Sequence, residues 1–551
     1  MLSADQSIIP VKLYYFLLSL LGLVALPGLF VPLMDNDSAH HANIALHMYL
    51  TGDYVNLIDK GTDYLDKPHL HFWLAAWSYE ILGVTGFAYK LPSFLFSILG
   101  VYSVFRLGRS LYNAAMGRIA ALIMASAVSF LLSVNDVRMD AILTGCIAFA
   151  SWQLTDLLVK NNWWNVLGGA AGLALGFSTK GIIGAALPGL FIALLAIQRK
   201  QWLLLRSPKW WVLIGLFGLF ICPVLYCYYL QFNLHPEKII RGKDHINGIR
   251  FILFNQSTER FSGGMGDTMK KDYLFFIHTF LWVFAPWSFL AVVALIKKLR
   301  LIRKQNSEWA SVVVFLFFLV LVSISDFKLP HYLNSCFPFA AVFTATFLIH
   351  FAGQAALEKR IFRLQLVLSL IILLAIAVLN FWSFQVNSYF VLAGVIMLLA
   401  TFIHFIRSTV MTDLSKTISL SVSAMALSFF LLNTNFYPQL LTYQGGKEMA
   451  DAIRGKIDAR SVYFWPGSNS ASFDFYTNTL RQEYTSGKEK QGKVWVAYYP
   501  KDSLVIKSAQ LKLVNTIRIK DYEITKLDAA FLDPGKREQV CSVMLLSEIL
   551  P

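Results

Sequence analysis

Residues 362–382 read FRLQLVLSLIILLAIAVLNFW, a run with a single charged residue, Arg363. A helix needs about 20 mainly apolar residues to cross the hydrocarbon core of a bilayer. Such runs recur along the chain, so the sequence predicts a multi-span α-helical membrane protein. About thirteen spans are expected, near residues 11–33, 87–107, 114–133, 139–159, 164–179, 182–198, 209–230, 273–296, 309–325, 331–352, 362–382, 388–406 and 417–435.

The composition agrees with this prediction. Of 551 residues, 56% are hydrophobic and 15% are charged, against about 25% charged in an average soluble domain. These values exclude a disordered chain, a secreted disulfide scaffold and an ordinary soluble enzyme. The 48 Lys and Arg exceed the 33 Asp and Glu by 15, but in so apolar a chain this excess does not indicate nucleic-acid binding. The five cysteines have no spacing typical of a zinc site or a disulfide framework.

The basic residues of the short loops fall unevenly on the two sides of the membrane. One set of alternating loops carries eighteen of them, and the opposite set carries only Arg138, Lys180 and Lys328. Because basic residues are enriched in cytoplasmic loops, the amino terminus is expected in the cytoplasm. Two long polar loops, 34–84 and 231–272, and residues 436–551 then lie outside, in the periplasm of a bacterium. The expected location is therefore the bacterial inner membrane.

The end of the chain is expected to form its own domain. Residues 436–551 hold no spanning run and follow a transmembrane domain of residues 1–435. Gly446–Ile453 has helical spacing, and strands are predicted at Ser461–Trp465, Val494–Tyr499 and Leu504–Ile506. No motif in this α/β tail carries chemistry, which favours a supporting or docking role.

Three short outer loops consist mainly of polar residues at the membrane boundary, where such residues are costly to bury. They are Asn135–Asp140, Ser178–Gly181 and Ser325–Tyr332, and each holds one of the three basic residues of the outer side. Cations at one membrane face suit the phosphate of a lipid carrier. The alternative is ordinary anchoring to lipid headgroups. The same loops offer further candidate contacts for a substrate, an acceptor or a metal, namely Asp140, His331 and Tyr332.

The first outer loop places Asp37 just after the first spanning run, in Met34-Asp35-Asn36-Asp37-Ser38. A carboxylate there can act as a general base or orient an acceptor. The same run supplies capping residues for a following helix, and the sequence does not decide between the two interpretations. Further on, Pro68 pushes Lys67 out of helical geometry. The Asp66–Lys67 pair then precedes another interfacial helix, where the lysine could hold a phosphate.

Histidines gather in the same loop, at His40, His41, His69 and His71. Together with Asp66 they could hold a divalent metal ion, the one cofactor that the sequence suggests. Histidines are also common at membrane interfaces without any metal, so both interpretations stay open.

These loops resemble those of the aminoarabinose (4-amino-4-deoxy-L-arabinose) lipid A transferase family. That family is a bacterial branch of the GT-C membrane glycosyltransferases, which are related to protein O-mannosyltransferases. Thirteen spans with a periplasmic α/β tail are also its architecture, and the resemblance covers the whole membrane region. The similar segments, in chain order, are Asp37 to Ala42 with the Gly52-Asp53 turn, Asp66-Lys67-Pro68, Arg138-Met139-Asp140, Thr179-Lys180-Gly181 and Lys328-Leu329-Pro330-His331-Tyr332.

The resemblance implies a reaction. A sugar would pass from a polyprenyl-phosphate carrier, of the undecaprenyl phosphate type, to an acceptor at the periplasmic face, either lipid A or another envelope glycolipid. By motif position, Asp37 matches the essential first-loop carboxylate, and Lys67 matches the residue that meets the carrier phosphate. Arg260 looks like a further phosphate contact. A lipid-linked donor also fits the lack of a P-loop or dinucleotide fingerprint.

The chain departs from the family where Ser38, His40 and His41 stand in place of an acid, an arginine and a tyrosine. Histidine is no equivalent of arginine, because it is mostly neutral at pH 7. Three other interpretations are considered. One is a protein O-glycosyltransferase of the same class, and another is an inactive relative that acts as a scaffold. The third is a transporter or flippase, which the one-sided ionisable residues and the lack of an internal repeat disfavour.

Overall fold

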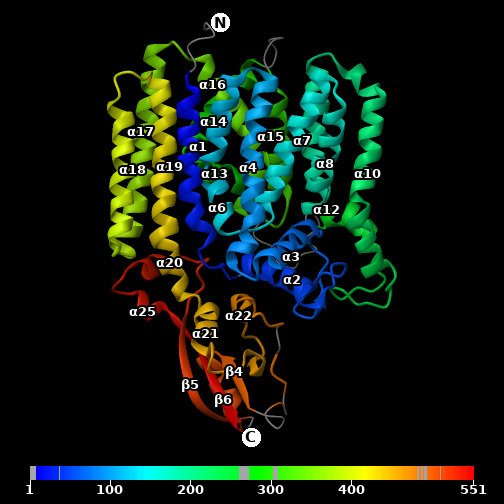
Figure 1. Ribbon diagram of the computed structural model, residues 1–551, viewed down its shortest axis with the longest axis vertical. Helices are drawn as coiled ribbons and strands as arrows, with labels where there is room; N and C mark the ends of the chain where they lie inside the picture. The colour runs from blue at the N-terminus through cyan, green and yellow to red at the C-terminus, as the bar shows by residue number, and fades with distance from the viewer. Residues whose placement is uncertain are drawn as a thin grey trace.

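The structure is a computed structural model of the 551-residue chain. It describes residues 8–35, 37–259, 272–301, 308–480, 483–485, 488, 493–508 and 511–550. Figure 1 shows long helices side by side, with a β-sheet beyond one end of the bundle. The bundle helices are α1 (Val11–Ala25), α4 (Gly86–Leu111), α5 (Ala114–Ala125), α6 (Val128–Asn135), α7 (Asp140–Lys160), α8 (Trp163–Lys180), α9 (Ile182–Gln198), α10 (Pro208–Tyr228), α13 (Phe275–Val283), α14 (Ser288–Leu301), α15 (Ala310–Ile324), α16 (Phe337–His350), α17 (Ala355–Ala377), α18 (Tyr389–Arg407) and α19 (Asp413–Leu431).

Each of the thirteen predicted runs falls on one of these helices or on a consecutive pair. Among the described residues, eight helices are long and apolar enough to cross a membrane. A ninth is added if α5 and α6, bent by 56° at their junction, count as one span. The remaining runs fall on shorter or less apolar helices, such as α9 and α15. The chain is therefore a multi-span helical membrane protein with eight or nine candidate spans.

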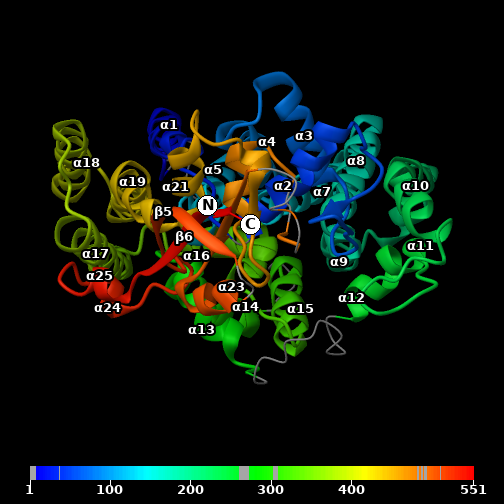
Figure 2. The ribbon, with the colours of Figure 1, turned by 90° about the horizontal axis from the view of Figure 1, so that it is seen from below.

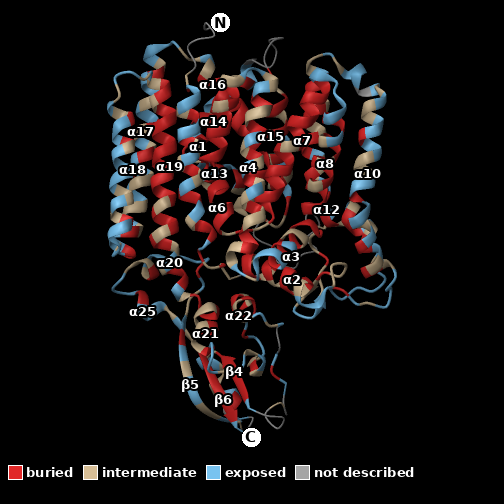
Figure 3. Cartoon of the chain, in the orientation of Figure 1, coloured by how far each residue is buried: buried red, intermediate tan, exposed pale blue. Residues whose placement is uncertain are grey.

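The burial pattern separates an inner from an outer layer of helices. In α7 and α19, 89% of the spanning window is buried, whereas in α17 and α18 only 22% is. Figure 3 shows long exposed faces on α10, α17 and α18 at the two sides of the bundle. These faces carry large apolar side chains such as Leu374 and Phe390. Apolar faces of this extent on helices long enough to cross a bilayer are typical of contact with lipid.

The first outer loop contains two helices and a short hairpin. Helix α2 (Asp37–Thr51) and helix α3 (Leu70–Leu82) flank a small hairpin of β1 (Ile58–Asp59) and β2 (Thr62–Asp63). The predicted helix after Pro68 is confirmed, because α3 begins at Leu70. Short helical segments follow α10 in the second outer loop, namely η3 (Tyr229–Asn233), α11 (Gly248–Arg250), η4 (Phe251–Asn255) and α12 (Gln256–Thr258).

The end of the chain forms a mixed four-stranded sheet in the order β3-β4-β6-β5. Strand β3 (Val462–Phe464) pairs in parallel with β4 (Val494–Tyr498), and β6 (Ser542–Leu550) pairs antiparallel with β4 and with β5 (Lys512–Asp521). The accompanying helices are α20 (Tyr437–Leu440), α21 (Gly445–Ile453), α22 (Ala471–Thr477), α23 (Ser503–Ser508), α24 (Ala529–Leu532) and α25 (Arg537–Val540). Seen from below, the sheet crosses the middle of the bundle's end, beside α2 (Figure 2).

One prediction about the tail needs correction, and two strands were missed. The strand expected at Leu504–Ile506 is wrong, since these residues lie in α23. A short apolar run fits a helix as well as a strand, and periodicity alone does not separate them. Strands β5 and β6 were not predicted. Strand β5 is interrupted between Val514 and Ile517, so its inside–outside alternation is broken.

The polar loops and the sheet share one end of the bundle. Figure 1 shows α2, α3 and the sheet at the lower end, while α1 starts at the upper end. Helix α22 of the tail packs against α2. The arrangement places the loops with the candidate site residues between the spanning helices and the sheet.

Candidate active site

Asp37 stands at the start of α2, where a carboxylate is favoured by the helix dipole. Its Oδ2 accepts a hydrogen bond from Nη1 of Arg138 at 2.6 Å. The predicted helix start is therefore confirmed, and a catalytic role of the carboxylate stays compatible with it. Asn36, the residue before it, lies outside the described residues.

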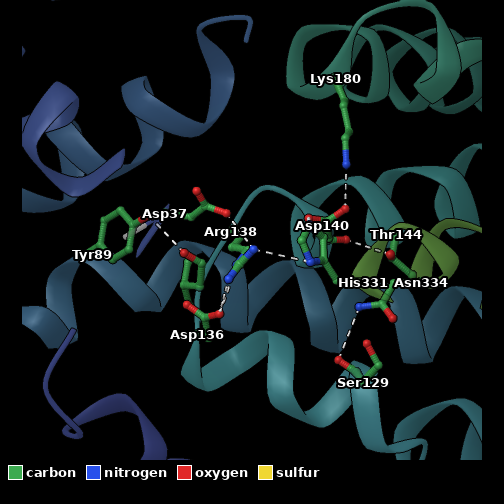
Figure 4. Close-up of polar contacts among 11 residues, drawn as sticks. Asp37, Tyr89, Ser129, Asp136, Arg138, Asp140, Thr144, Lys180, His331 and Asn334 are labelled. Carbon is green, nitrogen blue, oxygen red and sulfur yellow. Dashed lines mark hydrogen bonds and ion pairs between the residues drawn. The ribbon is translucent and has the colours of Figure 1, made fainter. Parts of the chain in front are cut away.

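Arg138 lies in the turn between α6 and α7 and joins two aspartates (Figure 4). Its Nε donates to Oδ2 of Asp136 at 2.9 Å, while Nη1 holds Asp37. Nη1 also lies 3.4 Å from Nδ1 of His331. Burial lowers the pKa of Arg138, but the charges of Asp136 and Asp37 outweigh it and raise the pKa. The guanidinium is therefore a permanent cation that sets the direction of the Asp37 carboxylate.

A second ion pair closes the neighbouring wall. Nζ of Lys180, at the end of α8, lies 2.7 Å from Oδ1 of Asp140, at the start of α7. Only 7% and 4% of these side chains are exposed. Nε2 of His331 lies 3.5 Å from the other oxygen of Asp140, and Nζ of Lys180 stands 4.4 Å from the ring centre of Tyr332. The chain of contacts in Figure 4 thus links α2, α7, α8 and the turn before α16.

The third wall comes from Lys67 and from the second outer loop. Lys67 lines the same cavity as Asp37. Its neighbour Asp66 pairs with Arg241, whose guanidinium also lies 3.2 Å from Oε2 of Glu259. Nε2 of Gln256 donates to the backbone carbonyl of Asp66 at 2.7 Å. The second outer loop therefore anchors the Asp66–Lys67 turn.

The resulting cavity has a volume of about 460 Å³. Its ionisable lining comprises four cations, three carboxylates and three histidines: Lys67, Arg138, Lys180 and Arg241; Asp37, Asp66 and Asp140; His40, His41 and His331. Tyr332 and Tyr64 add phenol groups. Since the cations outnumber the carboxylates by one, the cavity has a positive balance that suits an anionic phosphate.

Most of the residues predicted for the site line this cavity, together with Arg241, which was not predicted. The uneven charge of the short loops gives no signal for Arg241, because Arg241 lies in the long second outer loop. Its only local signal is its place in a basic segment with Lys238 and Lys243. Lys328 is not among the described lining residues; it is buried, and its ammonium donates to the carbonyl of Ser325. Arg260 lies outside the described residues.

The four histidines are not arranged as a metal site would require, although the ring of His41 contacts those of His40 and His71. Nε2 of His69 lies 2.8 Å from the carbonyl of Val55, and Nε2 of His71 lies 3.0 Å from the hydroxyl of Tyr89. His71 is not among the residues that line the cavity. In the part of the chain that the structure describes, no three His, Cys, Asp or Glu side chains are grouped to hold a metal ion. The predicted metal site on these histidines with Asp66 therefore finds no support in the geometry.

Burial lowers the pKa of three of these histidines, His41, His69 and His71. Desolvation lowers the pKa of His69 and of His71 to about 4. The pKa of His41 is also well below its ordinary value, first through burial and then through its cationic and histidine neighbours. His41 therefore adds no positive charge to the cavity.

Comparison with known proteins identifies this fold. Residues 66–227 match the family described as dolichyl-phosphate-mannose-protein mannosyltransferase. The crystal structure of ArnT from Cupriavidus metallidurans bound to undecaprenyl phosphate superposes with a TM-score of 0.72 at 15% identity, over 96% of this chain and 97% of that one. Its apo structure gives a TM-score of 0.69 at 16% identity, with the same coverage. The chain is thus a multi-pass membrane protein with the ArnT fold.

Sequence similarity shows which transferases this chain resembles. An undecaprenyl phosphate-alpha-4-amino-4-deoxy-L-arabinose arabinosyl transferase of Pseudomonas fluorescens (strain Pf0-1) is 26% identical over 337 residues, which cover 60% of this chain and 57% of that protein. A transferase of the same name from Pseudomonas aeruginosa (strain LESB58) is 25% identical over 317 residues, 56% of this chain and 54% of that one. The match thus spans little more than half the length of these relatives. The resemblance to the aminoarabinose transferase family, seen first in the loop motifs, is confirmed.

Proposed function

We propose that the chain is a glycosyltransferase that uses a polyprenyl-phosphate-linked sugar of the undecaprenyl phosphate type as its donor. The proposed acceptor is lipid A or a related glycolipid at the periplasmic face of the bacterial inner membrane. The observation that carries this proposal is the cavity at the lower end of the bundle, which Asp37 lines together with four cations. The names of the similar transferases support the donor and the sugar class.

The proposed step is a displacement at the anomeric carbon. The bond from that carbon to the carrier phosphate breaks, its electron pair stays on the phosphate oxygen, and a new bond forms to the acceptor oxygen. Lys67, Lys180 and Arg241 would stabilise the phosphate charge that develops. Asp37, held in direction by Arg138, would orient the acceptor and take the proton of a hydroxyl acceptor.

The proposed topology puts the cavity outside the cell. Helix α1 starts at the end of the bundle opposite the sheet (Figure 1), which requires an odd number of crossings before residue 436. Thirteen crossings meet this requirement if the shorter and bent helices also span. With the amino terminus in the cytoplasm, a transmembrane catalytic domain of residues 1–435 is then followed by a periplasmic α/β domain of residues 436–551.

The test is transfer of a radiolabelled sugar from a polyprenyl-phosphate donor in proteoliposomes that contain lipid A. We expect a labelled glycolipid, and a loss of roughly 10²- to 10⁴-fold in rate for Asp37→Asn. The matched control is Asp244→Asn, which changes an aspartate of the second outer loop that is 70% exposed and pairs only weakly with its neighbour His245.

Three results would contradict parts of this proposal. Full activity in Asp37→Asn would remove the catalytic role of that residue. Label on protein instead of lipid would favour the protein O-glycosyltransferase, an alternative that the match of residues 66–227 supports. Movement of the intact donor across the bilayer, with no new glycosidic bond, would favour the flippase.

A further inference from the structure

The segment just before Asp37 is held by the tail of the chain rather than by the membrane helices. The carboxylate of Asp35 accepts three hydrogen bonds from α22 and its cap. The hydroxyl of Ser470 donates at 2.9 Å, the hydroxyl of Ser472 at 2.8 Å, and the backbone N–H of Ser472 at 2.6 Å. More than 430 residues of sequence separate the partners of these bonds.

The backbone on the amino-terminal side of Asp35 is gripped as well. The N–H of Asp35 donates to Oε1 of Gln444 at 2.6 Å, and Nε2 of Gln444 donates to the carbonyl of Leu33 at 2.8 Å. The N–H of Leu33 donates to the hydroxyl of Tyr476 at 2.8 Å. Three backbone polar groups of residues 33–35 thus depend on two side chains of the tail.

The tail also forms a hydrogen bond with α2 itself. Nδ2 of Asn43 donates to the carbonyl of Ala471 at 2.8 Å, and the N–H of Ala39 donates to the carbonyl of Met34 at 3.0 Å. The first turns of α2 are therefore tied to the tail both directly and through residues 33–35. Figure 1 shows α22 immediately below α2.

The hydrogen bonds between the tail and residues 33–43, called the clamp below, have little room to adjust. Ser470, Ser472 and Gln444 are all buried. A Cβ added at Gly446 would stand 1.8 Å from the Oγ of Ser470 and 2.4 Å from the Oγ of Ser472, so α21 packs directly behind both hydroxyls. Burial raises the pKa of Asp35, and the bonds from Ser472 and Ser470 counteract it. All three donors face the carboxylate, which is the arrangement that stabilises its ionised form.

We propose that Asp35 is a positioning residue and that the tail, through Ser470, Ser472, Gln444 and Tyr476, sets the place of Asp37 in the cavity. The tail is then part of the catalytic unit rather than a separate appendage. The inference rests on the proposed function for its kinetic part, because it assumes that Asp37 acts on the acceptor. Its structural part stands on the hydrogen bonds alone.

The geometry explains why a small loosening would matter. Asp37 lies two residues from Asp35, and its carboxylate meets Arg138, which the membrane helices hold from the other side. If residues 33–35 are released, α2 can shift relative to α7 and its turn. A misplacement of about 1 Å in a catalytic constellation can cost about 100-fold in rate.

The experiment uses full-length protein in nanodiscs and two readouts. Hydrogen–deuterium exchange of residues 33–51 reports the clamp, and steady-state sugar transfer reports its effect on Asp37. The variants are Asp35→Ala, which removes the acceptor, and Ser472→Ala, which removes one hydroxyl donor and keeps the backbone donor. The milder Ser472→Ala keeps the test valid if Asp35→Ala fails to fold.

Two controls change an aspartate and a serine of the tail that have no contact with residues 33–35 in the hydrogen bonds described above. Asp458→Asn alters an exposed cap that accepts from the N–H of Arg460, and Ser508→Ala alters an exposed hydroxyl that donates to the carbonyl of Val505. Both should behave like the wild-type protein in exchange and in transfer.

We expect exchange of residues 33–51 to quicken about fivefold or more in both clamp variants. Turnover should fall about tenfold to 100-fold in Asp35→Ala at an unchanged KM for the donor, because the donor-phosphate contacts lie on other elements. Unchanged exchange in both variants would overturn the clamp, whatever the activity. Faster exchange with unchanged turnover of an active wild type would overturn the positioning role. If the wild type transfers no sugar, the proposed function fails, and the exchange result decides the clamp.

Discussion

Lys180 and Asp140 form a buried ion pair with 2.7 Å between Nζ and Oδ1. Only 7% of the Lys180 side chain and 4% of the Asp140 side chain are exposed. The pair joins the last residue of α8 to the first residue of α7. Two charges are held at low exposure in one wall of the cavity, and removing either would leave the other without its main compensation.

We therefore predict that Lys180→Met lowers stability more than the double variant Lys180→Met with Asp140→Asn. Breaking a buried pair by removing one partner typically costs about 3–5 kcal/mol, whereas replacing both partners is often close to neutral. The measurement is the melting temperature of the purified protein in detergent. Equal melting temperatures for the single and the double variant would show that the pair is not coupled.

The contact between Arg138 and Asp37 predicts that lysine cannot replace arginine at position 138. Arg138→Lys should keep the positive charge but lose the planar guanidinium, which donates to Asp136 and to Asp37 at the same time. We expect turnover to fall by about tenfold or more, with little change in stability, because the direction of Asp37 is no longer fixed. Arg250→Lys is the matched control, since Arg250 is exposed and lies outside the main cavity. Wild-type turnover in Arg138→Lys would show that charge alone suffices.

The place of Lys67 in the cavity predicts a role in donor binding. Lys67→Ala should raise the KM for the donor and lower kcat, with a loss of about 1.5–3 kcal/mol in kcat/KM, the range for a hydrogen bond to a charged group. Lys60→Ala, at an exposed residue of the β1–β2 hairpin, should behave like the wild type. An equal effect of the two substitutions would mean that Lys67 acts only through the overall surface charge.

The buried histidines predict a loss of stability in mild acid. The pKa of His69 and of His71 is about 4 in the folded chain, against an ordinary value of about 6.5. Between these values the unfolded chain binds protons that the folded chain does not, so lower pH favours unfolding. The stability is fully present above about pH 6.5 and is lost progressively as the pH falls towards 4, by about 2 kcal/mol per histidine at pH 5.

Melting temperatures measured from pH 7.5 to pH 5 check this prediction. His71→Gln retains a side chain that can bond with Tyr89 and does not titrate, so its melting temperature should depend less on pH. The hypothesis fails if the wild type and His71→Gln show the same pH dependence.

Much of the fold could be predicted from local sequence properties. The length of an apolar run and the distribution of charge around it are set within about 20 residues, so each of the thirteen runs falls on helix. The helices that begin at Asp37 and at Leu70 were also predictable, since capping residues and Pro68 act locally. Strands β5 and β6 were not, because β5 is interrupted between Val514 and Ile517 and β6 is buried along most of its length, so neither shows a regular inside–outside alternation.

The candidate site, like the fold, could be predicted from the sequence only in part. Its residue types and most of its members could be read from the outer loops, because isolated charges at a membrane boundary are costly and therefore conspicuous. Lys328 shows the limit of that signal: it is as conspicuous in sequence as Lys180, yet its ammonium turns to the carbonyl of Ser325. Direction of a side chain depends on the partners that packing brings near it.

By itself the sequence determined a multi-span helical protein with its polar loops on one side. These features follow from hydrophobicity and charge, which every residue carries wherever it lies. Only the tertiary structure decided that Arg138 meets Asp37 across 101 positions of sequence, that Arg241 closes the cavity on Asp66, and that α22 grips Asp35. Those contacts are decided by how the helices pack and by the need to satisfy buried polar groups, and no local pattern encodes either.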